Sequence, residues 1–395
     1  MSEPFDLRAA LEATSATVTS EGTAGAEAFR VFPPSVAALA RAVALVRARG
    51  LPVRVRGNGD APWAPPAGGV LLDVSALDRI AALDADTGIA RVEAGCSVAA
   101  LEAAARRAGS TLGPLLPSVR AGSVGAWLAG PTRGDRGIPG SRRETAALSV
   151  TAILADGRVA ESRAVPRSAT GPDLDHLSLG GEGRLSVIAA GWIRLLPSSV
   201  TASLSARAKD SASALRALQR LCADRLAPAR ARVIVAEAGG ARLGAAWEGP
   251  LTASRDRDRS ARALVQLGCT PEAEDAESTA FARASALADE AEVDATWAQL
   301  EALIAGSPAA GADLHFVGLH AGGSFASVLQ RGRSADEVAA AARTAGARVI
   351  APRRLRDEGP GWGALGAGKA WARLVDALGV GDVGSGAAST EGAGR

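Results

Sequence analysis

The first half of the chain combines apolar residues at strand spacing with apolar residues at helical spacing, which predicts mixed α and β structure. Residues 29–57 are typical of a strand, a helix and a second strand, with Ser35 placed to cap the helix and Gly50 placed to end it. A strand, a turn and a serine-capped helix follow again over residues 90–109. The pair Asp156-Gly157 lies between two apolar runs, which is the strongest short signal of a β-hairpin. This combination of helices, strands and antiparallel hairpins predicts an α+β fold.

The second half shows a different pattern, in which hairpins and single helices follow one another. A strand and a helix are expected over residues 204–226, a hairpin over 231–249 and a charged helix over 254–269. We expect an acidic linker over residues 271–292, then a helix, paired strands over 313–331, and a helix and strand over 334–352. This order predicts an antiparallel sheet with helices on one face.

The predicted organisation has four parts, which are 1–200, 201–352, 353–379 and 380–395. The first two are the α+β domains just described. The third is a helix expected to return to the first domain, and the last is rich in Gly, Ser and Ala and is expected to be disordered.

Composition and charge narrow the class of protein. The 395 residues include 44 basic and 42 acidic side chains, so the net charge of +2 implies no nucleic-acid partner. No apolar run is long enough for a transmembrane segment, and the N-terminus lacks the apolar core of a signal peptide, so we expect a cytoplasmic protein. The three cysteines have no CxxC spacing, which argues against a disulfide scaffold, a zinc site and an iron–sulfur site.

Three glycine-bearing turns carry the candidate chemistry. The longest stretch, Pro117–Glu144, is predicted to be a loop rich in glycine, proline and arginine, and two shorter turns lie at Arg56–Asp60 and Gly180–Gly183. Turns of this kind bring backbone N–H groups together into a concavity that binds anions such as phosphate. None of the three has the spacing of a P-loop or of a Rossmann GxGxxG turn.

Together these motifs, RGNGD, GSVGAWLAGPTRGDRGIPGSRRE and PDLDHLSLGGEGRLSVIAAGWIRLLP, resemble the PCMH-type FAD-binding domain of the vanillyl-alcohol oxidase family. The likeness covers roughly residues 28 to 198 and is greatest to the FAD-binding subunits of bacterial glycolate oxidase. It implies an FAD-binding domain with two subdomains, followed by a ferredoxin-like α+β cap domain. It also implies non-covalent FAD, because the loops lack the histidine and cysteine that the family uses for covalent attachment.

The resemblance assigns cofactor contacts by position. Gly57, Asn58 and Gly59 correspond to the first pyrophosphate turn, and Glu182, Gly183 and Ile188 line the adenosine or isoalloxazine side. The complete set of implied cofactor residues is Arg56, Gly57, Asn58, Gly59, Pro117, Ser123, Val124, Gly125, Ala126, Gly140, Ser141, Arg142, Glu182, Gly183 and Ile188.

Removing a hydride from a 2-hydroxy acid requires a base near the hydroxyl group and a cation for the carboxylate. The chain has no tyrosine, and His315 and His320 are the candidate bases, with a structural role in a sheet as the alternative. Five residues apart on one strand, they are expected to face opposite sides of a sheet. His176 is interpreted as a surface or structural residue. The candidate cations are the arginines of the long stretch, Arg133, Arg136, Arg142 and Arg143.

Two functions remain open at this point. The first is FAD-dependent oxidation of a small 2-hydroxy acid such as glycolate or lactate, with electrons passing to a partner subunit or a quinone. The second is a structural or regulatory subunit that has lost catalysis. Asp60 replaces the family's Thr or Ser, Ala126 replaces a glycine, and the family's C-terminal DPxxIFNPGR signature is missing, all of which favour the second.

Overall fold

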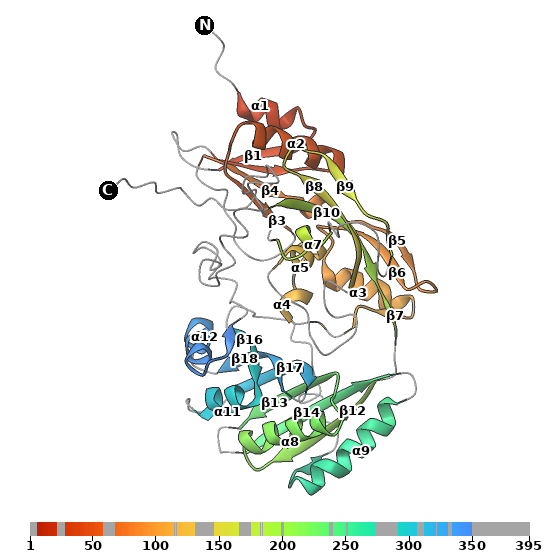
Figure 1. Cartoon of the computed structure of the whole chain (residues 1–395), viewed down its shortest axis with the longest axis vertical. Coiled ribbons are helices and arrows are strands. Elements are labelled where there is room, and N and C mark those ends of the chain that lie inside the picture. Colours follow the sequence, from red (N-terminus) through yellow and green to blue (C-terminus); the bar gives the residue numbers. More distant parts are fainter. Residues whose placement is uncertain are drawn as a thin grey trace, which may run out of the picture.

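The computed structural model describes two regions, which lie one above the other in Figure 1. The N-terminal region is formed by residues within 6–198 and the C-terminal region by residues within 201–349. The described residues are 6–21, 28–57, 68–113, 115, 117–130, 146–165, 175–181, 183, 185–198, 201–236, 240–249, 252–272, 291–305, 312–320, 322–330 and 334–349. The predicted C-terminal helix and tail, 353–379 and 380–395, lie outside them.

The N-terminal region contains two sheets, each with its own core. The first has the order β1-β2-β4-β3, with β1 antiparallel and the other three strands parallel. The apolar face of helix α2 packs in the core of this sheet, where Val31, Leu39 and Leu72 are fully buried. The elements of this half are α1 (Leu7–Glu12), β1 (Thr17–Glu21), β2 (Ala28–Phe32), α2 (Val36–Ala48), β3 (Val53–Arg56), β4 (Val70–Asp73) and the 3₁₀ turn η1 (Val74–Ala76).

The second sheet is antiparallel and has the order β5-β6-β10-β8-β9. Helices α3 and α5 cover it, and Leu101, Leu128 and Ile193 are fully buried in its core. A two-stranded ribbon, β7 with β11, lies where the chain leaves the region. The elements are β5 (Ile80–Asp84), β6 (Ile89–Glu93), α3 (Val98–Arg107), β7 (Ser110–Thr111), α4 (Pro117–Arg120), α5 (Val124–Ala129), β8 (Ala147–Leu154), β9 (Val159–Glu161), α7 (Asp175–Ser178), β10 (Ser186–Arg194) and β11 (Leu196–Pro197).

The predicted local signals of this region are confirmed. Ser35 caps α2, with its hydroxyl accepting from the Ala38 amide at 3.2 Å. Gly50 and Gly157 have φ of +61° and +82°, a left-handed conformation that suits glycine at a helix end and in a hairpin turn. The hairpin at Asp156-Gly157 joins β8 to β9.

The long stretch Pro117–Glu144 is not a loop throughout, so that prediction was wrong for its first half. Helix α4 begins at Pro117, and helix α5 follows after the Ser123 N-cap, whose hydroxyl accepts from the Ala126 amide. The apolar side chains of Val124, Trp127 and Leu128 recur at helical spacing and are buried, which is why a helix forms despite the glycines. Residues 131–145 lie outside the described part.

The C-terminal region is one antiparallel sheet of eight strands with the order β15-β12-β14-β13-β17-β18-β16-β19. Its elements are β12 (Thr201–Ala208), α8 (Ser211–Ala223), β13 (Arg230–Val235), β14 (Ala241–Glu248), α9 (Ala253–Gln266), β15 (Thr270–Glu272), β16 (Ala291–Thr296), α11 (Trp297–Ala305), β17 (Ala312–His320), β18 (Gly323–Gln330), α12 (Ala335–Thr344) and β19 (Arg348–Val349).

The sheet consists of two βαββαβ units joined edge to edge. In each unit the strands lie in the order fourth, first, third, second, and the two second strands, β13 and β17, pair antiparallel at the seam. This element order is that of a ferredoxin-like unit. The sequence analysis expected a single such domain, because it placed most of β15 and the first two residues of β16 within an acidic linker. Thr270–Glu272 contains a proline and β16 alternates with acidic residues, so neither segment carries an apolar strand signal.

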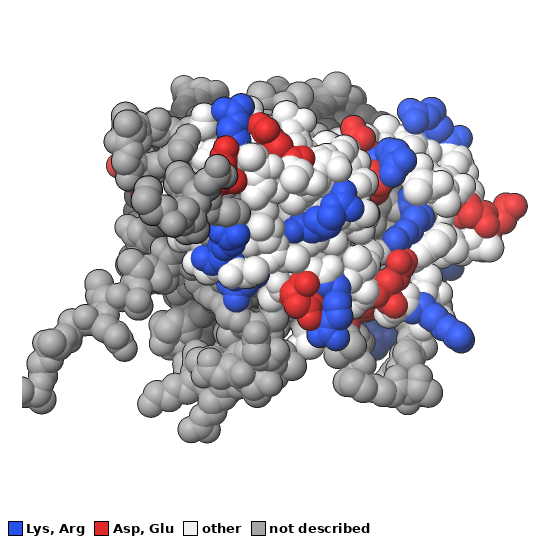
Figure 2. Space-filling view, turned by 90° about the horizontal axis from the view of Figure 1, so that it is seen from above, with Lys and Arg blue, Asp and Glu red and all other residues white. Residues whose placement is uncertain are grey.

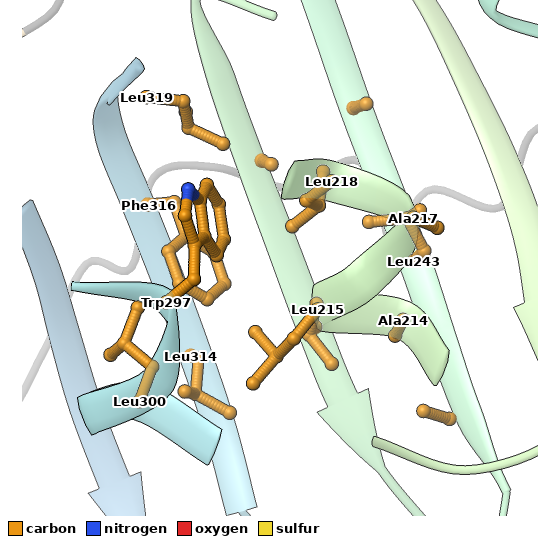
Figure 3. Packing of buried hydrophobic residues seen from close by; sticks show 14 of the residues in the cluster. Ala214, Leu215, Ala217, Leu218, Leu243, Trp297, Leu300, Leu314, Phe316 and Leu319 are labelled. Carbon is orange, nitrogen blue, oxygen red and sulfur yellow. The ribbon is translucent and has the colours of Figure 1, made fainter. Parts of the chain in front are cut away.

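The helices α9, α8, α11 and α12 contact one another in that order, so they form one layer on a single face of the sheet. Their shared core crosses the seam. Figure 3 shows Leu215 and Leu218 of α8 facing Trp297 of α11 and Phe316 of β17, whose ring centroids are 6.2 Å apart. The two units are therefore stabilised by one continuous apolar layer.

None of the helices within the described residues is long and apolar enough to cross a membrane. On the face seen from above in Figure 2, positive and negative side chains are interspersed, and the visible described residues gather no patch of one sign.

Candidate functional site

Two of the three predicted turns meet at the end of β3. Strand β3 ends at Arg56, and Gly57 follows it directly against Ser123, the N-cap of α5. A Cβ added at Gly57 would overlap the Ser123 hydroxyl oxygen, so no other residue type fits there without displacing that side chain. The first and second motifs, 66 positions apart in the chain by residue number (123 less 57), are thus neighbours in the fold.

The third turn lies beside the same strand. Gly183 has φ of +75°, and a Cβ at this position would lie 3.5 Å from a methyl group of Val55 on β3. The structure therefore brings Gly57, Ser123 and Gly183 around the end of one strand. Ile188, by contrast, is 4% exposed and packs within the core of the second sheet, so its side chain fills the interior.

The start of α5 does not supply the free N–H donors that its motif suggested. The amide of Val124 donates to the Cys96 carbonyl at 2.8 Å, and that of Gly125 donates to the Ala94 carbonyl at 2.7 Å. The Ala126 amide donates to Ser123. These three groups are already paired, and a diphosphate bound here would need donors from other positions.

Gly125 has a structural reason to be glycine. A Cβ here would lie 2.8 Å from the Ala94 Cβ and 3.0 Å from the Ala94 carbonyl oxygen, so it would force α5 away from the end of β6. The sequence analysis attributed this glycine to the approach of a ligand. In the structure, it permits the approach of helix and strand.

Arg56 lies at the carboxyl end of β3, opposite Asp73 at the end of β4, and the two charged groups are 3.8 Å apart. Asp73 is 3% exposed and also accepts from the Ser75 amide at 3.1 Å. Sequence reasoning named Arg56 but missed Asp73, because pairing across parallel strands leaves no local signal.

Many predicted site residues lie outside the described part of the chain, and the predictions for them stay predictions. They are Asn58, Gly59, Gly140, Ser141, Arg142 and Glu182, together with Asp60 and the candidate cations Arg133, Arg136 and Arg143. Pro117 begins α4.

The candidate bases His315 and His320 both lie on β17, in the C-terminal region. The register places His315 opposite Arg232 of β13, and His320 opposite Gly323 of β18. A register irregularity between Val317 and His320 interrupts the alternation of the strand. The side chains of both histidines lie outside the described part of the structure, so the expectation that they face opposite sides stays a prediction. His176 is exposed on α7, as expected of a surface residue.

A buried ion pair next to His315 was not predicted. Arg232 donates to both carboxylate oxygens of Asp313, at 2.9 and 2.7 Å, and each of the two residues is 5% exposed. Ala231 and Val233 belong to the core under the helices, so Arg232, between them, belongs to the opposite face of the sheet. Arg232 and Asp313 lie on strands in which apolar and polar residues are mixed, so the sequence alone predicts that these two charged side chains are exposed.

A charged junction connects the two regions. Arg120, the last residue of α4, is partly buried, and its electrostatic neighbours are Glu102 and Arg106 of α3 and Arg230 and Glu248 of the sheet. Burial lowers the pKa of the Arg120 guanidinium, with Glu102 opposing that effect. The Arg120 side chain thus lies where the N-terminal region meets the sheet face opposite the helix layer.

The cysteines have no features of a reactive site. Cys96 is 3% exposed, and burial first, followed by the charges of Asp78 and Glu93, raises the pKa of its thiol to about 11. It therefore packs as a small apolar residue, as expected. The described residues hold no group of three or more His, Cys, Asp and Glu side chains placed to bind a metal ion.

Comparison with known proteins finds a family match over the part of the chain that contains the first two turns. Residues 28–163 match the family model described as FAD binding domain. This match lies within the N-terminal region. A D-lactate dehydrogenase of Archaeoglobus fulgidus is 31% identical over 177 residues, which cover 44% of this chain and 40% of the relative. An uncharacterised FAD-linked oxidoreductase of Escherichia coli K12, YgcU, is 34% identical over 119 residues, which cover 30% of this chain and 25% of the relative.

The matches to these two curated relatives span less than half of the relatives' own length. Among solved structures, an alkyldihydroxyacetonephosphate synthase superposes with a TM-score of 0.67 at 17% identity, covering 89% of this chain and 74% of the other. That likeness shows a shared fold which extends over both regions.

The described residues fit FAD because of where the turns lie. They do not offer unpaired N–H donors at the start of α5. The turns that correspond to the family's cofactor contacts converge at the end of β3, and Gly57 and Gly183 leave no side chain of their own there. The amides at the start of α5 are used within the protein.

Proposed function

We propose that this protein is an FAD-dependent oxidoreductase, or a subunit of one, that oxidises a small 2-hydroxy acid such as glycolate or lactate. FAD is held without a covalent bond, and the electrons leave to a partner subunit or a quinone. The observation that carries the proposal is the convergence of Gly57, Ser123 and Gly183 at one strand end, where Gly57 and Ser123 belong to the segment that matches the FAD binding domain.

The residues divide into two roles in this proposal. The turns at Arg56–Gly57, Ser123 and Gly183 hold the cofactor, and the sheet of the C-terminal region covers the substrate. FAD, when bound, supplies the two-electron oxidant that accepts a hydride from the carbinol carbon. The hydroxyl proton passes to a base, for which His315 and His320 are the candidates, and the product is the 2-oxo acid. The likeness to a D-lactate dehydrogenase supports a hydroxy acid as substrate.

A second candidate function is a flavin-fold subunit without catalysis. The paired amides of Val124, Gly125 and Ala126 favour it, because they remove donors from one of the expected diphosphate turns. The two functions differ in one observable property, since only the first requires bound FAD to be reduced by substrate.

The decisive experiment is an absorption spectrum of the purified protein after FAD addition and desalting, followed by anaerobic addition of D-lactate and glycolate. Retained flavin bands that bleach with a hydroxy acid are expected. Retained flavin that no hydroxy acid bleaches would contradict the assigned substrate class. A protein that keeps no flavin would favour the non-catalytic function.

A matched pair of variants tests the position of the cofactor. Gly183→Ala and Gly109→Ala place a Cβ on glycines with nearly equal φ, +75° and +78°, so we expect a similar loss of stability of about 1–2 kcal/mol in both. Only Gly183 belongs to the proposed site. We therefore expect Gly183→Ala alone to lower FAD retention, measured by flavin absorbance per protein. Equal retention in the two variants would remove Gly183 from the site.

A further inference from the structure

Arg120 is a partly buried cation without a direct partner among the described residues. Within the described residues it makes no hydrogen bond and no ion pair. Its acidic neighbours are both engaged elsewhere, because Glu102 accepts from Arg106 at 2.6 Å and Glu248 accepts from Arg230 at 2.5 Å. Among the described residues of the junction, three arginines thus face two carboxylates, and Arg120 is the arginine that pairs with neither of them.

Partial burial of an unpaired charge is unfavourable, and burial is the main reason that the pKa of Arg120 is lowered. Glu102 cannot readily turn to Arg120, since it also accepts from the Thr111 hydroxyl at 2.8 Å and the Leu112 amide at 2.7 Å. The junction therefore retains a guanidinium whose charge no described residue compensates through a hydrogen bond or an ion pair. An anionic ligand would compensate it, and a planar guanidinium binds a carboxylate through two parallel hydrogen bonds.

The position of Arg120 links it to both halves of the proposed reaction site. Three residues later the chain reaches Ser123, the N-cap that contacts Gly57, and the Gly122 amide between them donates to the Val119 carbonyl at 3.1 Å. Figure 1 shows α4 at the end of the N-terminal region that faces the C-terminal region. The neighbour Arg230 lies on β13, two residues before Arg232, which the register pairs with His315.

We propose that Arg120 binds the carboxylate of the substrate at the junction of the two regions, and so selects hydroxy acids over neutral alcohols. This rests on the proposed function, since it assigns the cation which that reaction requires. It is an alternative to the arginines of residues 133–143, for which the prediction stays untested because they lie outside the described residues. The same guanidinium geometry would suit the diphosphate of FAD, so the test separates the two anions.

The test uses oxalate, a carboxylate dianion that cannot be oxidised as a hydroxy acid, as the probe. Oxalate binding to the full-length protein is measured by calorimetry, with and without FAD, for the unchanged protein, Arg120→Gln and Arg107→Gln. Arg107 is an exposed arginine on α3 and serves as the control for a change of charge. We expect Arg120→Gln to weaken oxalate binding about 10-fold or more and Arg107→Gln to leave it within about twofold.

Each other result contradicts the assignment. Oxalate affinity within about twofold in Arg120→Gln would show that Arg120 does not bind the carboxylate. Loss of FAD retention in Arg120→Gln would assign the residue to the cofactor diphosphate. If the unchanged protein keeps no FAD, the proposed function fails, while oxalate binding to the flavin-free protein still tests Arg120.

Protein stability provides a second measurement. Removing a cation without a partner is expected to leave the melting temperature unchanged or to raise it, and oxalate is expected to stabilise only proteins that keep Arg120. A purely structural role for Arg120, as a bridge between Glu102 and Glu248, predicts a lower melting temperature in Arg120→Gln and no effect of oxalate. Arg120→Lys, which keeps the charge, should recover part of the affinity.

Discussion

The two regions of this protein achieve close packing by different means. In the N-terminal region, glycines allow backbones to approach, and a Cβ at Gly57, Gly95 or Gly125 would lie within 3.0 Å of a neighbouring atom. In the C-terminal region Gly323 is as tightly enclosed, whereas a Cβ at Gly240, Gly249 or Gly346 would lie more than 3.0 Å from its nearest neighbour. That region is held across its seam by side chains, including the buried pair of Arg232 and Asp313. Close packing in the N-terminal region thus depends on glycines, which have no side chain, and packing across the seam of the C-terminal region depends on side chains that contact one another.

The largest loss of stability is expected from a substitution at the seam between β13 and β17. Asp313→Ala leaves the Arg232 guanidinium buried without its carboxylate, and we expect the free energy of unfolding to fall by about 3–5 kcal/mol. Glu272→Ala is the control, because its partner Arg207 has a side chain that is 62% exposed, and such a pair contributes about 1 kcal/mol or less. Denaturant unfolding measures both. Similar losses in the two variants would mean that the seam does not depend on the buried pair.

The next largest loss of stability tests packing by glycine in the N-terminal region. Gly57→Ala is expected to lower stability by about 1–3 kcal/mol, because the new methyl group overlaps the Ser123 side chain. Ser123→Gly alone is expected to cost only a few tenths of a kcal/mol, since glycine is tolerated at an N-cap. The double variant should then be nearly as stable as Ser123→Gly. An additive loss in the double variant would mean that the two motifs are not in contact.

Helix caps of the two regions provide a smaller effect that depends on pH. Helices α2 and α8 both have 13 residues, and they are capped by the Ser35 hydroxyl and the Asp210 carboxylate. We expect Ser35→Ala and Asp210→Ala each to lower stability by about 1 kcal/mol at neutral pH. Hydrogen bonds from the Ser213 hydroxyl and amide lower the pKa of Asp210, so its contribution is present above the unfolded pKa and is lost as pH falls through the folded one.

Unfolding at a series of pH values should therefore show the effect of Asp210→Ala disappearing in acid, while that of Ser35→Ala persists. A constant difference for both variants would show that the charge of Asp210 contributes nothing to its cap.

The smallest effect concerns cysteine reactivity, which we expect to be equally low in the two regions. Burial raises the pKa of Cys96 to about 11 and that of Cys222 to about 12. At pH 8, roughly one molecule in a thousand or fewer then carries a thiolate at either position. Iodoacetamide should label the folded protein slowly and the urea-unfolded protein at all three cysteines. Rapid labelling of Cys96 in the folded state would indicate a reactive thiol beside the second motif.

The difference between the regions also explains what the sequence could predict. Packing by glycine leaves a visible pattern, so the sequence grouped the turns at Gly57, Ser123 and Gly183, which lie around the end of β3 in the structure. Packing by side chains does not. The second βαββαβ unit was missed because its first strand, β16, alternates with acidic residues, although α11, the β17–β18 hairpin, α12 and β19 were anticipated. In the first unit, the fourth strand, β15, was missed because it contains Pro271.

The candidate site shows the same limit. Ser123 could be named from its motif, but the use of the Val124 and Gly125 amides by the Cys96 and Ala94 carbonyls depends on contacts between elements far apart in the chain. Arg120 lay within the predicted stretch and was not singled out. Its significance comes from Glu248 of the other region, and no spacing in the sequence reports that neighbour.

The outer strands of the eight-stranded sheet bear on how the protein behaves when crowded. Within the described residues the sheet ends in β15, three residues long, and β19, two residues long, and Pro271 in β15 has no N–H to offer. Long, flat edges recruit strands from other molecules, whereas edges this short offer few backbone groups to pair with. The long strands β13 and β17 pair with each other at the seam, so neither is left as an unpaired edge. The strands that remain at the outer edges, β15 and β19, are too short to favour aggregation.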